Sequence, residues 1–173
     1  MTAHADFLPL TLCVLTVSDT RTAQNDSSGD YLAGALAEAG HRLHERRIAK
    51  DDKYRIRAIV ADWIADERVH GVIVTGGTGF TGRDSTPEAL RPLLDKEMPG
   101  FGEMFRVLSF EEIGTSTLQS RAFAGLANDK FLFCLPGSTS ACKTAWEKLI
   151  RAQLDARTAP CNLANLRPRL REA

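Results

Sequence analysis

A short apolar run that leads directly into a glycine-rich loop constrains this chain more than any other stretch. Residues 72–74 read Val-Ile-Val, a β-branched run typical of a strand covered on both faces. The sequence TGGTG follows over residues 75–79, and because its glycines carry no Cβ atom, a ligand can approach the backbone amides closely. The sequence RDSTPE over residues 83–88 then supplies a charged pair and a helix start, with Thr86 as the cap and Pro87 as the first helical residue. This order of strand, glycine loop and helix N-terminus is typical of a site for an anion or a nucleotide.

Two known nucleotide-binding patterns can be compared with this loop. Gly77, Gly79 and Gly82 fit the dinucleotide pattern G-x-G-x-x-G, in which the helix begins within the glycines and an acidic residue closes the next strand about 20 residues later. Here the helix start follows the last glycine, and residues 101–106 have helical spacing. A nicotinamide-dependent oxidoreductase therefore remains a distant alternative. A Walker A phosphate loop is excluded, because no Gly-Lys-Ser/Thr sequence follows the loop.

The composition is that of an ordinary globular domain. The length of 173 residues suffices for one core, so we predict a single domain over residues 1–173. The 22 basic and 22 acidic residues balance, which gives no electrostatic reason to expect nucleic acid or an anionic membrane as a partner. We find no apolar stretch long enough to span a bilayer and no signal-peptide pattern at the start. The four cysteines lack CxxC spacing, with Cys13 and Cys134 in apolar runs, so we expect a reducing, cytosolic location.

Strand-like runs alternate with helical patterns through the first half of the chain. Residues 10–17 predict a buried strand, and residues 41–48 are charged enough to predict an edge strand. Amphipathic helices are expected after the cap at residues 26–29 and after Asp51-Asp52. This alternation predicts an α/β fold with a mostly parallel sheet and helices on both faces.

The second half adds an antiparallel hairpin and a second glycine junction. Asn128-Asp129 predicts a two-residue turn between strands at residues 118–127 and 130–135, the latter leading into Pro-Gly-Ser-Thr at residues 136–139. Ser138 at the following helix N-terminus could bind a phosphate oxygen or only cap its own helix.

Two further groups of side chains, the histidines and an apolar group, lead to predictions. His41 and His44 would point to opposite faces of a strand, so we expect these and His70 to face solvent rather than hold a metal. An apolar group crowds one region beside the Pro-Gly break at residues 99–100, and any excess that one core cannot bury should lie at a subunit contact. It comprises Phe101, Phe105, Phe110 and Ile113.

The string TGGTGFTGRDSTPEA over residues 75–89 resembles the signature of the molybdopterin-binding domain family. The strings EMPGFGEMFR over residues 97–106 and LPGS over residues 135–138 fit that family in the same order, as do VSDTR over residues 17–21 and residues 43–52. The resemblance extends from about residue 10 to about residue 165.

This resemblance implies a three-layer α/β/α sandwich in a cytosolic homo-oligomer of trimers or hexamers. It also implies a role in molybdenum cofactor biosynthesis, with molybdopterin as the ligand and other enzymes of that pathway as candidate partners. Adenylyltransferases of the family use ATP and Mg²⁺ to place AMP on the terminal phosphate of molybdopterin. The resemblance therefore favours a molybdopterin adenylyltransferase with ATP as co-substrate and Mg²⁺ as cofactor.

Matched position by position, the resemblance implies site residues in four loops. Asp84 and Asp51 match acidic residues of the catalytic centre and would be the Mg²⁺ ligands, although Asp51 could equally be a helix cap alone. All four loops follow strand-like stretches, so we expect them to converge beyond the carboxyl ends of the strands. The residues that would bind substrate or nucleotide are Thr75, Gly76, Gly77, Thr78, Gly79, Asp19, Gly137 and Ser138.

The second loop also departs from the adenylyltransferase pattern. Those enzymes have Pro-Lys soon after the Pro-Gly, whereas here Lys143 comes later and Trp146 stands where a polar residue is expected. Lys50 also replaces a proline just before Asp51. These differences support an alternative function, a non-catalytic accessory protein of the pathway that binds molybdopterin and leaves ATP intact.

Overall fold

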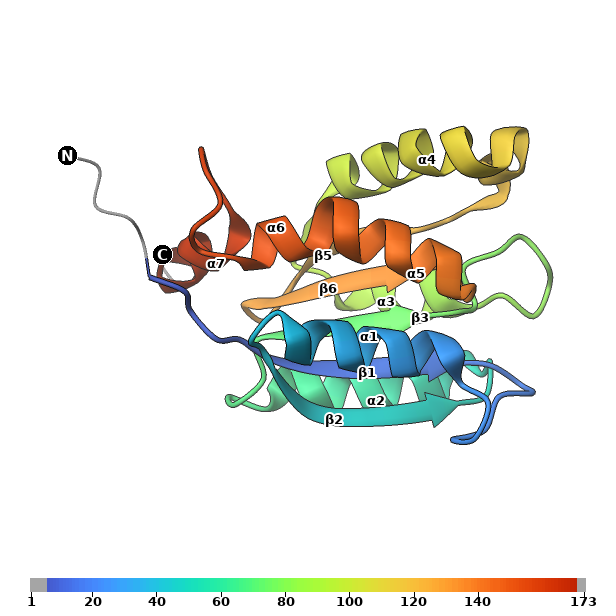
Figure 1. Cartoon of the computed structure of the whole chain (residues 1–173). Coiled ribbons are helices and arrows are strands. Elements are labelled where there is room, and N and C mark those ends of the chain that lie inside the picture. Colours follow the sequence, from blue (N-terminus) through green and yellow to red (C-terminus); the bar gives the residue numbers. More distant parts are fainter. Residues whose placement is uncertain (1–5, 171–173) are drawn as a thin grey trace.

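The structure is a computed structural model that describes residues 6–170 (Figure 1). Within them a six-stranded sheet has the order β2-β1-β3-β6-β5-β4. The first four strands in this order pair in parallel, whereas β5 is antiparallel to β6 and β4 is antiparallel to β5. The strands are β1 (Thr11–Val17), β2 (Arg42–Ala49), β3 (Gly71–Thr75), β4 (Lys96–Glu97), β5 (Phe123–Ala127) and β6 (Lys130–Leu135).

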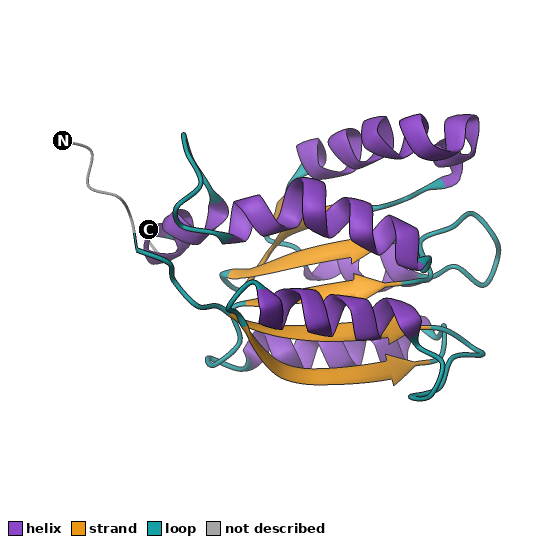
Figure 2. Cartoon of the chain, in the orientation of Figure 1, coloured by secondary structure: helices purple, strands orange, loops and turns teal. Residues whose placement is uncertain are grey.

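Helices cover both faces of the sheet (Figure 2). One face carries α1 (Ser27–Glu38), α4 (Pro99–Ile113) and α5 (Thr139–Ala145), and the other carries α2 (Lys53–Ala65) and α3 (Thr86–Leu90). Helix α5 continues through η3 (Trp146–Ile150) into α6 (Arg151–Leu154). The remaining elements are η1 (Arg91–Leu93), η2 (Gly114–Gln119), α7 (Leu163–Leu166) and η4 (Arg167–Arg169). In the described part of the chain, no helix combines the length and apolar character needed to cross a bilayer.

The position of β3 inside the sheet, between two layers of helices, explains why its sequence is apolar without alternation. All five of its residues are buried. Ile73 packs into the cluster formed with α1, α4 and α5, whereas Val72 and Val74 pack into the cluster formed with α2 and α3. Because the strand contributes to a core on each face, both sets of alternate side chains must be apolar. The predicted three-layer sandwich with a mostly parallel sheet is confirmed.

The hairpin and the edge strand were also predicted correctly, although the bounds differ: the edge strand β2 runs from Arg42 to Ala49 instead of over residues 41–48. Asn128 and Asp129 have φ angles of 46° and 58°, as a two-residue turn between antiparallel strands requires. The predicted strand at residues 118–127 is too long, because η2 continues to Gln119 and β5 begins only at Phe123.

The expectation that the histidines face solvent is wrong for His41. Its side chain is buried, and its Nδ1 accepts the amide hydrogen of Leu10 at 3.2 Å. Burial lowers the pKa of His41, and burial with nearby Arg167 and Lys130 lowers the pKa of the half-buried His70 to about 4. Among residues 6–170, no group of three or more histidines, cysteines and carboxylates is placed to hold a metal.

Candidate functional site

A cleft of about 410 Å³ lies beyond the carboxyl ends of β1, β3 and β6. In Figure 1 the arrowheads of these strands point to the side from which the loops at residues 18–26 and 76–85 project. These loops and the Pro-Gly-Ser loop after β6 form part of the cleft, and α4 and η2 form a further wall. Of the predicted site residues, those that line it are Gly76, Gly77, Thr78, Gly79, Asp84, Gly137 and Ser138.

The first glycines of the loop are required by close backbone packing. Gly76 and Gly77 have φ angles of 100° and 65°, and a Cβ atom on Gly76 would overlap the carbonyl oxygen of Val17. The Gly76 amide donates to the carbonyl oxygen of Leu135 at 2.9 Å, so this amide is already used. The amides of Gly77 and Thr78 have no partner within the described residues and remain available to an anion.

The helix after the loop begins differently from the prediction. Ser85 is the residue before α3, and Thr86 is the first residue of the helix rather than its cap. The Thr86 hydroxyl donates to the carbonyl oxygen of Gly76 at 2.8 Å, and its amide donates to that of Gly77 at 3.0 Å. Thr86 therefore fixes the start of the glycine loop, which its position in the sequence did not indicate.

Asp84 lies in the cleft and holds its own loop together. Its Oδ2 accepts hydrogen bonds from the amide and the hydroxyl of Thr81 at 2.8 and 2.6 Å. The carboxylate also packs so tightly against Gly79 that a Cβ atom there would lie 2.7 Å from Oδ2. Burial acts to raise the pKa of Asp84, but the hydrogen bonds from Thr81, the Gly79 amide and the charge of Arg121 outweigh it and lower the pKa. Asp84 is thus held ionised.

Asp51 and Asp52 have separate roles. Asp52 is the cap of α2, because its Oδ1 accepts the amide hydrogens of Tyr54 and Arg55. The Oδ1 of Asp51 instead accepts the amide and hydroxyl hydrogens of Ser85, at 3.1 and 2.5 Å. Asp51 therefore does not cap α2. It contacts the segment that follows the glycine loop without lining the cleft itself.

Asp19 lies on the outer side of the same region. It pairs with Arg83 at 2.6 Å and accepts the amide hydrogen of Asp51 at 3.2 Å. The hydrogen bond from Arg83 is the main reason that the pKa of Asp19 is lowered. Asp19 thereby connects the loop after β1 to Asp51 and to Arg83, the residue before Asp84, but it is not a cleft-lining residue.

The second loop is fixed by hydroxyl groups. Ser138 caps α5 by accepting the Ala141 amide hydrogen at 3.2 Å, and the Ser28 hydroxyl donates to the carbonyl oxygen of Gly137 at 2.8 Å. Thr75 is buried beneath the loop and donates to the carbonyl oxygen of Pro136 at 2.8 Å. Capping by Ser138 is confirmed, whereas its contact with a phosphate remains a prediction.

Several cleft residues were not predicted. Arg21 and Asp84 are the charged side chains among the described residues that line the cleft, and Arg21 is fixed by donating to Ser27 Oγ at 2.9 Å. Its position in the polar loop after β1 was the available sequence signal. Phe105 and Ser109 on α4 and Gln119 on η2 carry no such signal, because only the packing of these two elements brings them to the cleft.

The carboxylates of Asp51 and Asp84 fit a site in which Mg²⁺ is shared between the protein and a phosphate. They do not fit a site in which the protein alone supplies all the metal ligands. Asp51 Oδ2 lies 2.8 Å from where a Cβ atom on Gly77 would be, and Asp84 packs in the same way on Gly79. The two carboxylates thus lie against Gly77 and Gly79, which are two positions apart in the glycine loop. Mg²⁺ sites of this type use one or two carboxylates and fill their other positions with water and substrate phosphates.

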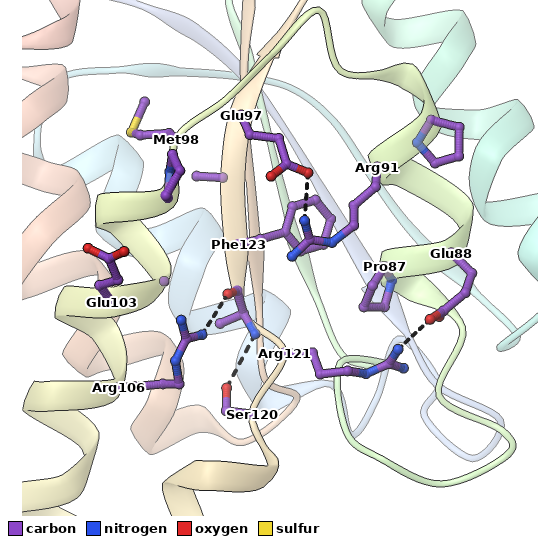
Figure 3. A pocket seen from close by; sticks show the side chains of 15 residues that line it. Pro87, Glu88, Arg91, Glu97, Met98, Glu103, Arg106, Ser120, Arg121 and Phe123 are labelled. Atoms are coloured by element: carbon purple, nitrogen blue, oxygen red, sulfur yellow. Dashed lines mark hydrogen bonds and ion pairs between the residues drawn. The ribbon is translucent and has the colours of Figure 1, made fainter.

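A second cavity, of about 490 Å³, lies between α3, β4, the start of α4 and residues 120–124 (Figure 3). It is lined by three arginines and three glutamates, several of which pair with one another. The smaller cleft is the better candidate for a ligand site, because three strand ends, two glycine loops and unpaired amides converge there.

Comparison with known proteins identifies the family of this chain. Residues 13–156 match the family model described as a probable molybdopterin binding domain. Molybdenum cofactor biosynthesis protein B of Escherichia coli strain K12 is 57% identical over 157 residues, which are 91% of this chain and 92% of that protein.

Solved structures show the same relationship. A crystal structure of a molybdenum cofactor biosynthesis protein B has a TM-score of 0.86 and 40% identity, covering 96% of this chain and 98% of that one. The crystal structure of tungsten cofactor synthesizing protein MoaB from Pyrococcus furiosus has a TM-score of 0.73 and 37% identity. The match covers 82% of this chain and 91% of that one. The chain belongs to the molybdopterin-binding (MoaB/Mog) domain family.

Proposed function

We propose that this protein acts in molybdenum cofactor biosynthesis as a molybdopterin adenylyltransferase. The observation that carries this proposal is the cleft itself, where two glycine loops, an ionised carboxylate and two unpaired amides meet at the strand ends. In this reaction an oxygen of the molybdopterin phosphate attacks the α-phosphorus of ATP, and the bond to the β-phosphate breaks to release pyrophosphate. Attack by one anion on another requires positioning and charge stabilisation more than covalent participation of the protein.

The residues of the cleft have roles that follow from their charge. The amides of Gly77 and Thr78 would donate to phosphate oxygens, and Arg21 would supply positive charge from the loop after β1. Asp84 and Asp51 would hold Mg²⁺, which when bound neutralises phosphate charge as it develops. The loop of Gly137 and Ser138 also lines the cleft, with Gly137 packed against Gly76.

A direct assay tests this proposal. Purified protein incubated with molybdopterin, ATP and Mg²⁺ is expected to release pyrophosphate and to form adenylylated molybdopterin. Reactions that lack molybdopterin or Mg²⁺ serve as controls. No pyrophosphate above the level without protein would refute the adenylyltransferase function.

One observation favours a second candidate, a non-catalytic molybdopterin-binding accessory protein. Lys143, which follows the second loop and lies within α5, is 5.7 Å from the centre of the Tyr31 ring and does not line the cleft. Lys143 would therefore not contribute its charge to ATP phosphates bound in the cleft. This function predicts that molybdopterin binds, as measured by calorimetry, while ATP remains intact.

A further inference from the structure

Arg121 connects three separate parts of the region around the glycine loop, although it does not line the cleft. Its Nε donates to the carbonyl oxygen of Gly79 at 2.7 Å, and its Nη2 donates to that of Asp84 at 2.8 Å. The remaining nitrogen, Nη1, pairs with Glu88 on α3, as Figure 3 shows. One side chain thus joins two points of the loop to the helix that follows it.

The two carbonyl groups mark the ends of one loop. Residues 79–84 leave the glycine loop and return to α3, and Asp84 is the last of them. The backbone amide of Arg121 also donates to the carbonyl oxygen of Thr78 at 2.9 Å, and its guanidinium lies 5.9 Å from the centre of the exposed Phe80 ring. Arg121 therefore fixes the separation of the two loop ends from a position on the segment before β5.

The rest of the loop has few restraints of its own. Thr81 and Asp84 bond to each other within the loop, and Arg83 pairs with Asp19 while remaining largely exposed. A Cβ atom on Gly82 would meet nothing within 4 Å. Exposed ion pairs contribute little to stability, so the partly buried contacts of Arg121 are the stronger restraint.

We propose that Arg121 is a positioning residue that holds the loop of residues 79–84 in the geometry that adenylyl transfer requires. This inference rests on the proposed function. Arg121 acts through the loop backbone: it fixes Asp84 against the cleft and keeps the neighbouring amides of Gly77 and Thr78 aligned. Glu88 holds the guanidinium in the plane from which both carbonyl oxygens can be reached.

The contacts explain why arginine serves this role. Its planar guanidinium donates in several fixed directions at once, whereas a lysine ammonium is a compact charge on a flexible stem. A lysine at this position could pair with Glu88 or with one carbonyl oxygen but could not join all three groups. Arg121→Lys should therefore retain only part of the effect.

Hydrogen–deuterium exchange of the full chain tests the positioning role without any ligand. In Arg121→Ala we expect amides of residues 79–85 to exchange about ten to a hundred times faster, as the loss of hydrogen bonds to a charged group implies. Arg91→Ala is the matched control, because Arg91 pairs with Glu97 and lies over Phe123 in the same cavity, away from the loop. It should leave exchange at residues 79–85 unchanged.

Steady-state kinetics tests the consequence for the reaction. We expect Arg121→Ala to lower kcat by about 10- to 100-fold with little change in KM, Arg121→Lys to lie between it and wild type, and Arg91→Ala to match wild type. Unchanged exchange at residues 79–85 in Arg121→Ala and Arg121→Lys, or faster exchange throughout the chain in both, would overturn the positioning role. An inactive wild-type protein would refute the adenylyltransferase function but not the role of Arg121, which hydrogen–deuterium exchange at residues 79–85 still decides.

Discussion

The carboxylate of Asp84 combines two properties that a single substitution can separate. It fixes the loop by accepting both Thr81 hydrogen bonds on one oxygen, and it carries a negative charge into the cleft. Asp84→Asn keeps an oxygen for both hydrogen bonds and removes the charge. We expect the variant to fold with a free energy of unfolding within about 1 kcal/mol of wild type and to bind molybdopterin. It should lose most adenylyl transfer, as measured by pyrophosphate release.

Asp52→Asn is the control for this substitution. Asp52 follows Asp51 in the chain and caps α2, and asparagine caps helices about as well as aspartate. This variant should transfer AMP at the wild-type rate. If Asp84→Asn also turned over like an active wild-type protein, Asp84 would have only the structural role of closing its loop.

At the scale of elements, the junction between β3 and α3 depends on backbone space at Gly76. A Cβ atom there would overlap the Val17 carbonyl oxygen, and the φ angle of 100° strains any other residue. We expect Gly76→Ala to lower the free energy of unfolding by about 2 kcal/mol or more, as measured by urea denaturation. Gly82→Ala should change it by less than about 0.5 kcal/mol, because a Cβ atom at Gly82 meets nothing within 4 Å. Equal midpoints for the two variants would show that β1 moves to accommodate the methyl group.

Most elements could be predicted from sequence because their signals are local. The apolar run of β3, the turn at Asn128-Asp129 and the cap Asp26 of α1 each depend on residues that are neighbours in the chain. The loops of the cleft could be predicted as well, since parallel strands bring their carboxyl ends to one edge.

What could not be predicted depends on contacts between distant segments. Thr86 looks like a cap in sequence, but its hydroxyl is bound to Gly76, so Ser85 takes the position before the helix. His41 looks solvated, but it accepts a hydrogen bond from Leu10, 31 residues earlier. Arg121 reaches the loop from 42 residues away, and nothing in its local sequence indicates that contact.

At the scale of the whole molecule, the apolar group around α4 divides into two parts. Phe101 and Phe105 are buried in the core, whereas Phe110 and Ile113 are more than half exposed. The exposed pair belongs to an apolar face of α4 and η2, which also includes Met104, Val107 and Leu118. A face of this kind on one helix marks an interaction surface, and we expect copies of this chain to cover it in a homo-oligomer. Because Ile113 also lines the cleft, such an assembly would border the candidate site.

Charge placed on this face should dissociate the assembly without unfolding the chain. Val107 and Phe110 are exposed, so Val107→Glu and Phe110→Glu do not bury a carboxylate in the core of one copy, but they would bury it at a contact between copies. Sedimentation at micromolar concentration should show an oligomer for wild type and monomers for both variants. Tyr54→Glu, at an exposed aromatic position on α2, is the control and should remain oligomeric. A wild-type protein that sediments only as a monomer would contradict the expected assembly. Oligomers in all the variants would place the contact on another face.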